Sequence, residues 1–226
     1  MAKGGRGGRR GMGGGVAKGE LTLPDGSKIE FDGELKFGAK DPALNPTVRK
    51  NIESWEAKRA NAKVEYAYSV DANGNPIGRG EIRGGKDSVR TPYSYHSTPD
   101  ATFTHIHPRG DAMLGGTFSD ADLSNFAYFG NKTERAKAKE GTYSISKDKG
   151  FDAKGFMSYA KSSQSKHRDE YTKKVDNLVK TYRTTDMSYD DYLKGNAKAF
   201  NTYLVKRHND LIAGQKKYGY KYTLEK

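Results

Sequence analysis

The sequence predicts a mixed α/β domain that is flanked by a Gly/Arg-rich tail and a helical extension. Between residues 20 and 150, short segments rich in β-forming residues alternate with amphipathic helical patterns. Beyond residue 150, apolar residues recur at helical spacing. Residues 1–19 hold almost no apolar side chains, so burial cannot offset the entropy lost on ordering them. We therefore expect a flexible tail over 1–19, an α/β domain over 20–150 and a basic helical extension over 151–226.

Turn and capping residues delimit the elements of the first half. A Pro-Asp-Gly turn predicts a hairpin of strands 20–23 and 28–31. Asn45 and Pro46 suit the first positions of a helix that should end near residue 62. The Asn73-Gly74 pair predicts a second hairpin, which joins strands 64–70 and 77–82.

The second half begins with strands and continues with helices. We expect a short strand at 88–92, a strand at 101–107, a helix at 119–129 and a strand at 141–146. Apolar residues from 171 to 182 predict a first long helix. Ser188 begins the second at a capping box, Gly214 is the expected end, and an alternating strand follows at 220–224. These helices should pack on the central domain or on a partner.

Charge and composition limit the classes of partner and location. The formal net charge of +12 divides into +4 over residues 1–20, +1 over 21–150 and +7 over 151–226. Basic ends indicate an anionic partner such as nucleic acid or an acidic protein, and Arg6, Arg9 and Arg10 are candidate contacts. No apolar run is long enough to span a membrane and no signal sequence is visible. The absence of cysteine fits the cytoplasm and excludes thiolate metal ligands.

Two histidines of the segment 103–110 have the spacing of metal ligands on a strand. His105 and His107 alternate with Phe103 and Ile106, and residues two apart in a strand point to the same face. Pro108 then ends the strand. Asp122, in the first turn of the next helix, could supply an oxygen ligand. Two imidazoles, one carboxylate and an open fourth position are the ligand set of a catalytic zinc site.

These motifs resemble those of the JAMM (MPN+/JAB) zinc metalloproteases. The shared pattern is a glutamate on an early strand, then His105-Ile-His107-Pro108, then Ser119-x-x-Asp122 at the start of a helix. The resemblance covers roughly residues 45–146 and is stronger toward bacterial and phage members than toward the eukaryotic enzymes. Eleven residues separate His107 from Ser119, more than the family usually has. A phage origin would make the virion an alternative to the cytoplasm.

The resemblance implies a JAB/MPN-like sheet flanked by helices and a specific division of roles. His105, His107 and Asp122 would bind Zn²⁺. Glu65 would accept a proton from the attacking water and pass it to the leaving amine. Ser119 would donate a hydrogen bond to the oxyanion. The implied activity is zinc-dependent hydrolysis of a peptide or isopeptide bond in a protein or peptide substrate.

Several alternatives remain open from the sequence. Glu81 on the next strand could replace Glu65, and Asp111 could replace Asp122 as the ligand. His96 is expected in a loop. His167 and His208 are expected to be solvated on helices among Lys and Arg. The alternative function is a non-catalytic structural or nucleic-acid-associated protein, for example part of a phage particle, that binds through its basic ends.

Overall fold

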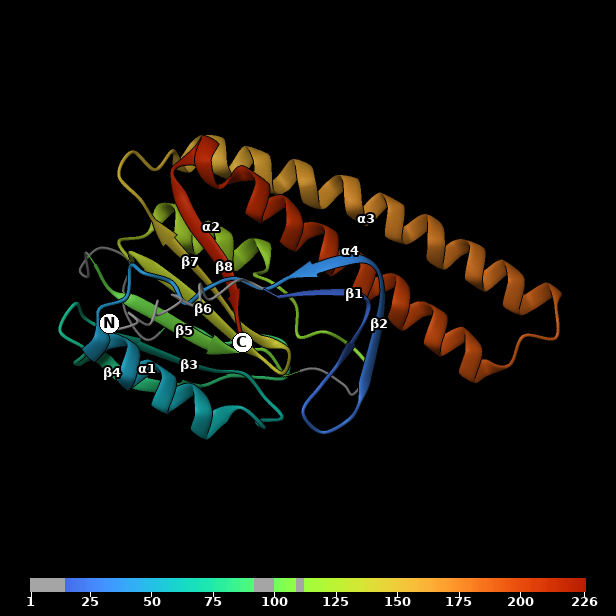
Figure 1. Ribbon diagram of the computed structural model, residues 1–226, viewed down its shortest axis with the longest axis horizontal. Helices are drawn as coiled ribbons and strands as arrows, with labels where there is room; N and C mark the ends of the chain where they lie inside the picture. Colours follow the sequence, from blue (N-terminus) through green and yellow to red (C-terminus); the bar gives the residue numbers. More distant parts are fainter. Residues whose placement is uncertain (1–14, 92–99, 109–111) are drawn as a thin grey trace, which may run out of the picture.

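The computed structural model describes residues 15–91, 100–108 and 112–226, and these form a mixed α/β fold (Figure 1). The mixed α/β prediction is therefore confirmed. A sheet of six strands has the order β4-β3-β5-β6-β7-β8, and β1 and β2 form a separate hairpin. The strands are β1 (Val16–Thr22), β2 (Lys28–Lys36), β3 (Tyr66–Val70), β4 (Pro76–Arg83), β5 (Thr102–Ile106), β6 (Thr133–Ala138), β7 (Gly141–Lys147) and β8 (Tyr220–Glu225). The helices are α1 (Pro46–Arg59), α2 (Asp120–Tyr128), α3 (Ala153–Thr184) and α4 (Tyr189–Tyr218).

The sheet is antiparallel except at its centre, where β5 and β6 run parallel. A parallel pair needs a crossover connection, and α2 lies in that connection. Helix α1 covers one face of the sheet, while α2, α4 and the β1–β2 hairpin cover the other (Figure 1). The main apolar core fills this second side, and it includes Phe31, Phe118, Phe126 and Phe156.

The N-terminal hairpin begins earlier than the sequence predicts. Val16 pairs with Lys36 and Lys18 pairs with Glu34, so residues 16–19 belong to β1 and not to the tail. A register shift between Lys18 and Glu20 accompanies the left-handed backbone of Gly19, with φ of 70°. Strand β1 has few apolar residues of its own. Its pairing with β2 explains why residues 16–19 are ordered, although their composition predicted a flexible tail.

Helix α1 begins where Asn45 caps it. The Asn45 side chain accepts a hydrogen bond from the Val48 amide, and Pro46 occupies the first turn. Val48 and Ile52 face the sheet and pack with Leu44 and Val70 in a small apolar cluster. This cluster is too small to fill the interface, and charged side chains occupy the remainder.

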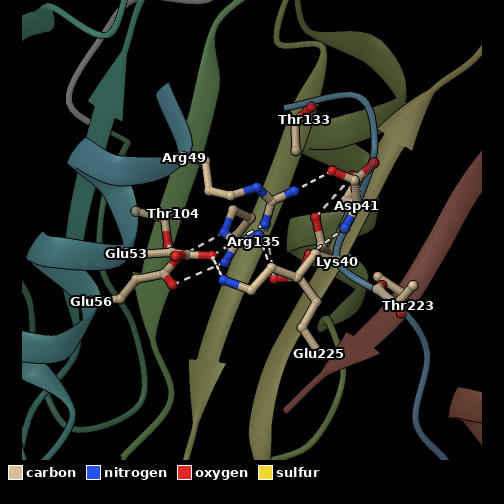
Figure 2. A network of polar contacts seen from close by, with 12 residues as sticks. Lys40, Asp41, Arg49, Glu53, Glu56, Thr104, Thr133, Arg135, Thr223 and Glu225 are labelled. Carbon is tan, nitrogen blue, oxygen red and sulfur yellow. Dashed lines mark hydrogen bonds and ion pairs between the residues drawn. The ribbon is translucent and has the colours of Figure 1, made fainter. Parts of the chain in front are cut away.

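A buried ion network centred on Arg135 lies between α1 and the sheet, as Figure 2 shows. The Arg135 guanidinium binds both oxygens of Glu56, at 2.8 and 3.0 Å, and reaches Glu225 at 3.1 Å. Glu56 also accepts a hydrogen bond from Thr104, at 2.8 Å. Burial alone would lower the pKa of Arg135, but the carboxylates Glu56 and Glu225 raise it above its ordinary value. The network thus joins α1, β5, β6 and β8.

Helices α3 and α4 form a long antiparallel hairpin that extends beyond the sheet (Figure 1). Gly214 does not end α4, contrary to expectation: the helix continues to Tyr218, and Gly219 caps it with φ of 70°. A Cβ at Gly214 would lie 2.6 Å from both Tyr159 and Tyr220, so this glycine permits close packing. After α4 the chain returns to the sheet, where β8 pairs with β7.

Two further elements differ from the sequence prediction. Residues 88–91 form no strand, because the backbone turns back and the Gly85 amide bonds to the Ser88 carbonyl at 2.8 Å. Strand β6 was not predicted, since its sequence Thr-Glu-Arg-Ala-Lys-Ala lacks a hydrophobic pattern. Among the helices of the described residues, none is long and apolar enough to cross a membrane.

Candidate metal centre

The two histidines of the motif lie at the end of β5, between β3 and β6. His105 is in the strand and His107 directly follows it, and the His107 amide extends the ladder by bonding to the Lys137 carbonyl at 2.8 Å. Their Nε2 atoms lie 2.8 Å apart. The prediction that both imidazoles share one face of the strand is confirmed. His105 is 2% exposed and His107 9%, so the pair lies at the edge of the core.

Asp122 reaches the histidines from the first turn of α2. Ser119 caps this helix, and the two residues form a reciprocal capping box. The Ser119 amide and hydroxyl each donate to Asp122 Oδ2 at 2.7 Å. The same oxygen lies 3.6 Å from His105 Nε2 and 4.0 Å from His107 Nε2. The long connection after His107 therefore leaves Ser119 and Asp122 in register with the histidines.

The three donor atoms have the separations of a metal ligand set. His105 Nε2, His107 Nε2 and Asp122 Oδ2 lie within 4.8 Å of one another. The point in their plane that is equidistant from all three lies about 2.1 Å from each, so the three atoms are close enough together to bind one ion at zinc bond lengths of about 2.0–2.2 Å. Two neutral imidazoles and one carboxylate suit zinc chemically. The residues present therefore fit the zinc ion that the sequence motif implies.

The electrostatics of the triad keep Asp122 ionised. Burial alone would raise the pKa of Asp122, but His105, His107 and the Ser119 hydroxyl hold it well below its ordinary value. Burial alone would lower the pKa of His105, but Asp122 and, to a smaller extent, the charge of Glu65 raise it. Without a cation between them, the carboxylate thus favours a proton on the imidazole. A metal ion would supply the positive charge in place of that proton.

The tautomer of His107 is set by the backbone. Its Nδ1 lies 3.0 Å from the carbonyl oxygen of Gly116. A carbonyl can only accept a hydrogen bond, so Nδ1 carries the proton and the Nε2 lone pair is directed to the triad. This arrangement is common for histidines that bind metals.

Glu65 lies just before β3, at the end of the sheet that holds the histidines. Its backbone bonds with Gly84 and Gly85 at 2.8 Å, which continues the pairing of β3 and β4. Ala67 pairs with His105, so the alternation of an extended chain places Glu65 on the face of the histidines. Its negative charge contributes to the raised pKa of His105. The structure thus brings Glu65 to the side of the sheet where the triad lies.

Glu81 is directed away from the triad. It pairs with Tyr68 on the opposite face, where Trp55 Nε1 donates to it at 2.6 Å and Arg59 binds it at 2.7 and 2.9 Å. These partners lower the pKa of Glu81, the hydrogen bond from Arg59 contributing most. The alternative in which Glu81 replaces Glu65 is therefore wrong.

The remaining candidates are either outside the described residues or buried elsewhere. Arg6, Arg9, Arg10, His96 and Asp111 lie outside the described residues. His167 and His208 were expected to be solvated, and this is wrong. The two side chains pack between elements, so they are 5% and 0% exposed, with His167 Nε2 2.9 Å from Asp210 and His208 Nε2 2.8 Å from the Lys36 carbonyl.

Two acidic residues near the triad were not found from the sequence. Glu134 on β6 is fully buried, and burial together with the charge of Asp122 raises its pKa well above the ordinary value. Glu140, in the turn between β6 and β7, bonds to the chain just before α2. Both belong to a part of the sequence in which no element was predicted, so no sequence signal placed them near the histidines.

No model of a known protein family matches this chain, and the searches of curated proteins and of solved structures found no match either. The assignment of the metal centre therefore depends on the geometry of its residues.

Proposed function

We propose that this chain is a zinc-dependent hydrolase that cleaves a peptide or isopeptide bond, with a JAMM-like metal centre in a JAB/MPN-like fold. The observation that carries the proposal is the triad of His105, His107 and Asp122, whose donor atoms lie 2.8, 3.6 and 4.0 Å apart, close enough to bind one ion. The order of a glutamate, His-x-His-Pro and Ser-x-x-Asp along the chain supports it further.

Part of the proposed site reaches the surface of the protein. His107 and Asp122 are partly exposed, Ser119 is exposed and Glu65 is half-buried. A zinc ion held by the triad would lower the pKa of a water molecule toward about 7 and polarise the scissile carbonyl. Glu65 would take the proton of that water and deliver it to the leaving amine, which is the work of a general base and then a general acid.

Ser119 would have two roles in the proposed reaction, one toward Asp122 and one toward the substrate. Its hydroxyl donates to Asp122 and also accepts from the Asp122 amide at 3.2 Å, so it orients the carboxylate ligand. To stabilise an oxyanion, the hydroxyl would turn from Asp122 toward the substrate carbonyl. Such a donor is typically worth about 10²–10³-fold in rate.

Zinc content tests the metal centre. Protein purified without chelator should hold one zinc ion per chain, and His107→Ala should lose it together with the increase in melting temperature that zinc gives. His167→Ala is the matched control, because it removes a buried histidine that lies outside the triad. Zinc absent from the wild type, or retained by His107→Ala, would refute the proposal.

Catalysis needs a separate test. A library of peptides and isopeptide-linked conjugates should contain a substrate that the zinc-loaded chain cleaves. Glu65→Gln should lower the rate by about 10²–10⁴-fold while zinc affinity stays unchanged. Glu81→Gln is the control, since it makes the same change on the opposite face of the sheet. Equal rates for Glu65→Gln and the wild type would remove Glu65 from the mechanism.

One observation favours the alternative of a non-catalytic binding protein. The α3–α4 hairpin is basic, and near the connection between its helices Tyr182, Tyr189 and Leu193 are exposed, with the rings of Tyr182 and Tyr189 in contact. A binding protein that uses its basic ends for nucleic acid would associate with it in a salt-sensitive way. Salt-sensitive binding that is lost on deletion of residues 1–14, with zinc bound but no hydrolysis of any substrate, would favour this function.

A further inference from the structure

The connection from β5 to the triad's helix is held by side chains from distant parts of the chain. Glu140 accepts hydrogen bonds from the amides of both Gly115 and Gly116, each at 2.9 Å, through its two carboxylate oxygens. It is 5% exposed. The Tyr143 hydroxyl donates to the same carboxylate at 2.8 Å. A buried carboxylate that accepts three hydrogen bonds is held firmly, so it fixes the two glycine amides in turn.

The glycines allow this close approach. A Cβ at Gly115 would lie 2.4 Å from the Ala138 side chain. Gly116 has a φ of 87°, and a Cβ there would lie 3.0 Å from Leu204. Residues 115 and 116 therefore pack between the β6–β7 turn and α4, and larger side chains would displace the backbone from Glu140.

The other side of Gly116 is fixed as well. The Thr117 hydroxyl lies 2.7 Å from the Tyr222 hydroxyl on β8, and Tyr222 lies 2.9 Å from His208 Nδ1 on α4. The peptide group that carries the Gly116 carbonyl is thus held between Glu140 and Tyr222. This carbonyl is the one that meets His107 Nδ1 at 3.0 Å.

We infer that Glu140 is a positioning residue for the metal centre. It holds the Gly115–Gly116 backbone so that the Gly116 carbonyl orients the His107 ring and keeps the proton on Nδ1. This inference rests on the proposed function, because the ring orientation matters for a triad that binds zinc. Partners that orient a metal-binding histidine are typically worth about 10–100-fold in metal affinity.

The test compares Glu140→Gln with Glu56→Gln. Both replace a buried carboxylate that accepts several hydrogen bonds, but Glu56 belongs to α1, on the opposite face of the sheet. Zinc dissociation constants are measured for each chain by competition with a chromogenic chelator. We expect Glu140→Gln to weaken zinc binding about 10–100-fold and Glu56→Gln to leave it within about twofold of the wild type.

A second measurement needs no metal. Long-range ¹H–¹⁵N correlation on the apoprotein reports which ring nitrogen of His107 carries the proton. The wild type and Glu56→Gln should show the Nδ1–H form, and Glu140→Gln should show a mixture of forms. If Glu140→Gln does not fold, Tyr143→Phe removes one of the three hydrogen bonds and should weaken zinc binding in the same direction, by at most about tenfold.

The outcomes separate the two proposals. If the wild type binds no zinc, the proposed function fails and the role of Glu140 fails with it. If the wild type binds zinc and His107→Ala does not, but Glu140→Gln equals Glu56→Gln in both measurements, the inference about Glu140 is overturned and the metal centre stands.

Discussion

Lowering the pH from 7 to 4.5 should destabilise the protein through His208. This residue belongs to α4 and its side chain is fully buried. Its Nδ1 lies 2.9 Å from the Tyr222 hydroxyl and its Nε2 lies 2.8 Å from the Lys36 carbonyl. Burial lowers the pKa of His208 from its ordinary value of 6.5 to about 4. The unfolded chain therefore binds a proton more readily than the folded chain across this range.

The sign and the size of the effect follow from these pKa values. Well above pH 6.5, His208 is neutral in both the folded and the unfolded state, so it adds no pH dependence to stability. As the pH falls toward 4, the unfolded state gains protons first, so the folded state loses about 1 kcal/mol by pH 5.5 and about 2–3 kcal/mol by pH 4.5. The loss levels off below about pH 4, where the folded state becomes protonated too.

Urea unfolding of the wild type and of His208→Gln measures this contribution. Glutamine can donate to the Lys36 carbonyl and accept from Tyr222, yet it does not titrate. Groups such as His105 and Asp122 titrate in both chains, so their contributions cancel in the difference. The stability advantage of the wild type over His208→Gln should shrink by about 2 kcal/mol from pH 7 to pH 4.5. A difference that stays constant within about 0.5 kcal/mol would refute the reasoning.

Three further predictions concern packing and capping. Arg135→Met leaves the Glu56 carboxylate buried without its cation, so the free energy of unfolding measured in urea should fall by about 3–5 kcal/mol; a loss below about 1 kcal/mol would contradict this. Gly214→Ala should cost about 1–3 kcal/mol in the same assay, because the added methyl group meets the Tyr159 ring, and a neutral result would show that the ring moves freely. Ser119→Ala removes the cap of α2 and should cost about 1 kcal/mol while weakening zinc binding in chelator competition; unchanged zinc affinity would show that the capping box does not orient the carboxylate.

The residues of the triad could be predicted because their signals are local. Two histidines in alternation on a strand share a face whatever surrounds them. The Ser119 cap fixes Asp122 within one helical turn, and the same residues mark the helix start in the sequence. The long connection after His107 does not move Asp122 away from the histidines, because hydrogen bonds to Glu140 and Tyr222 hold the backbone on either side of Gly116.

The elements that could not be predicted depend on contacts between distant residues. Strand β6 carries Glu134, Arg135 and Lys137, a pattern typical of an exposed segment. Arg135 is nevertheless 1% exposed, because Glu56 and Glu225 neutralise it from 79 and 90 residues away in the sequence. The burial of His208 depends likewise on Tyr222 and on a carbonyl of β2. Such partners are known only when the fold is known.

The position of β8 next to β7 has a consequence for the order of events during synthesis. The chain adds about 70 residues between these strands, which takes several seconds at about 5–20 residues per second. Until then the hydrogen-bonding groups of β7 on that side lack their strand, and an open strand edge invites pairing with other chains. Helices of 32 and 30 residues run out and back over nearly equal lengths, so they return the chain to the sheet beside β7. Strand β8 therefore cannot cover this edge of β7 until both helices have been synthesised.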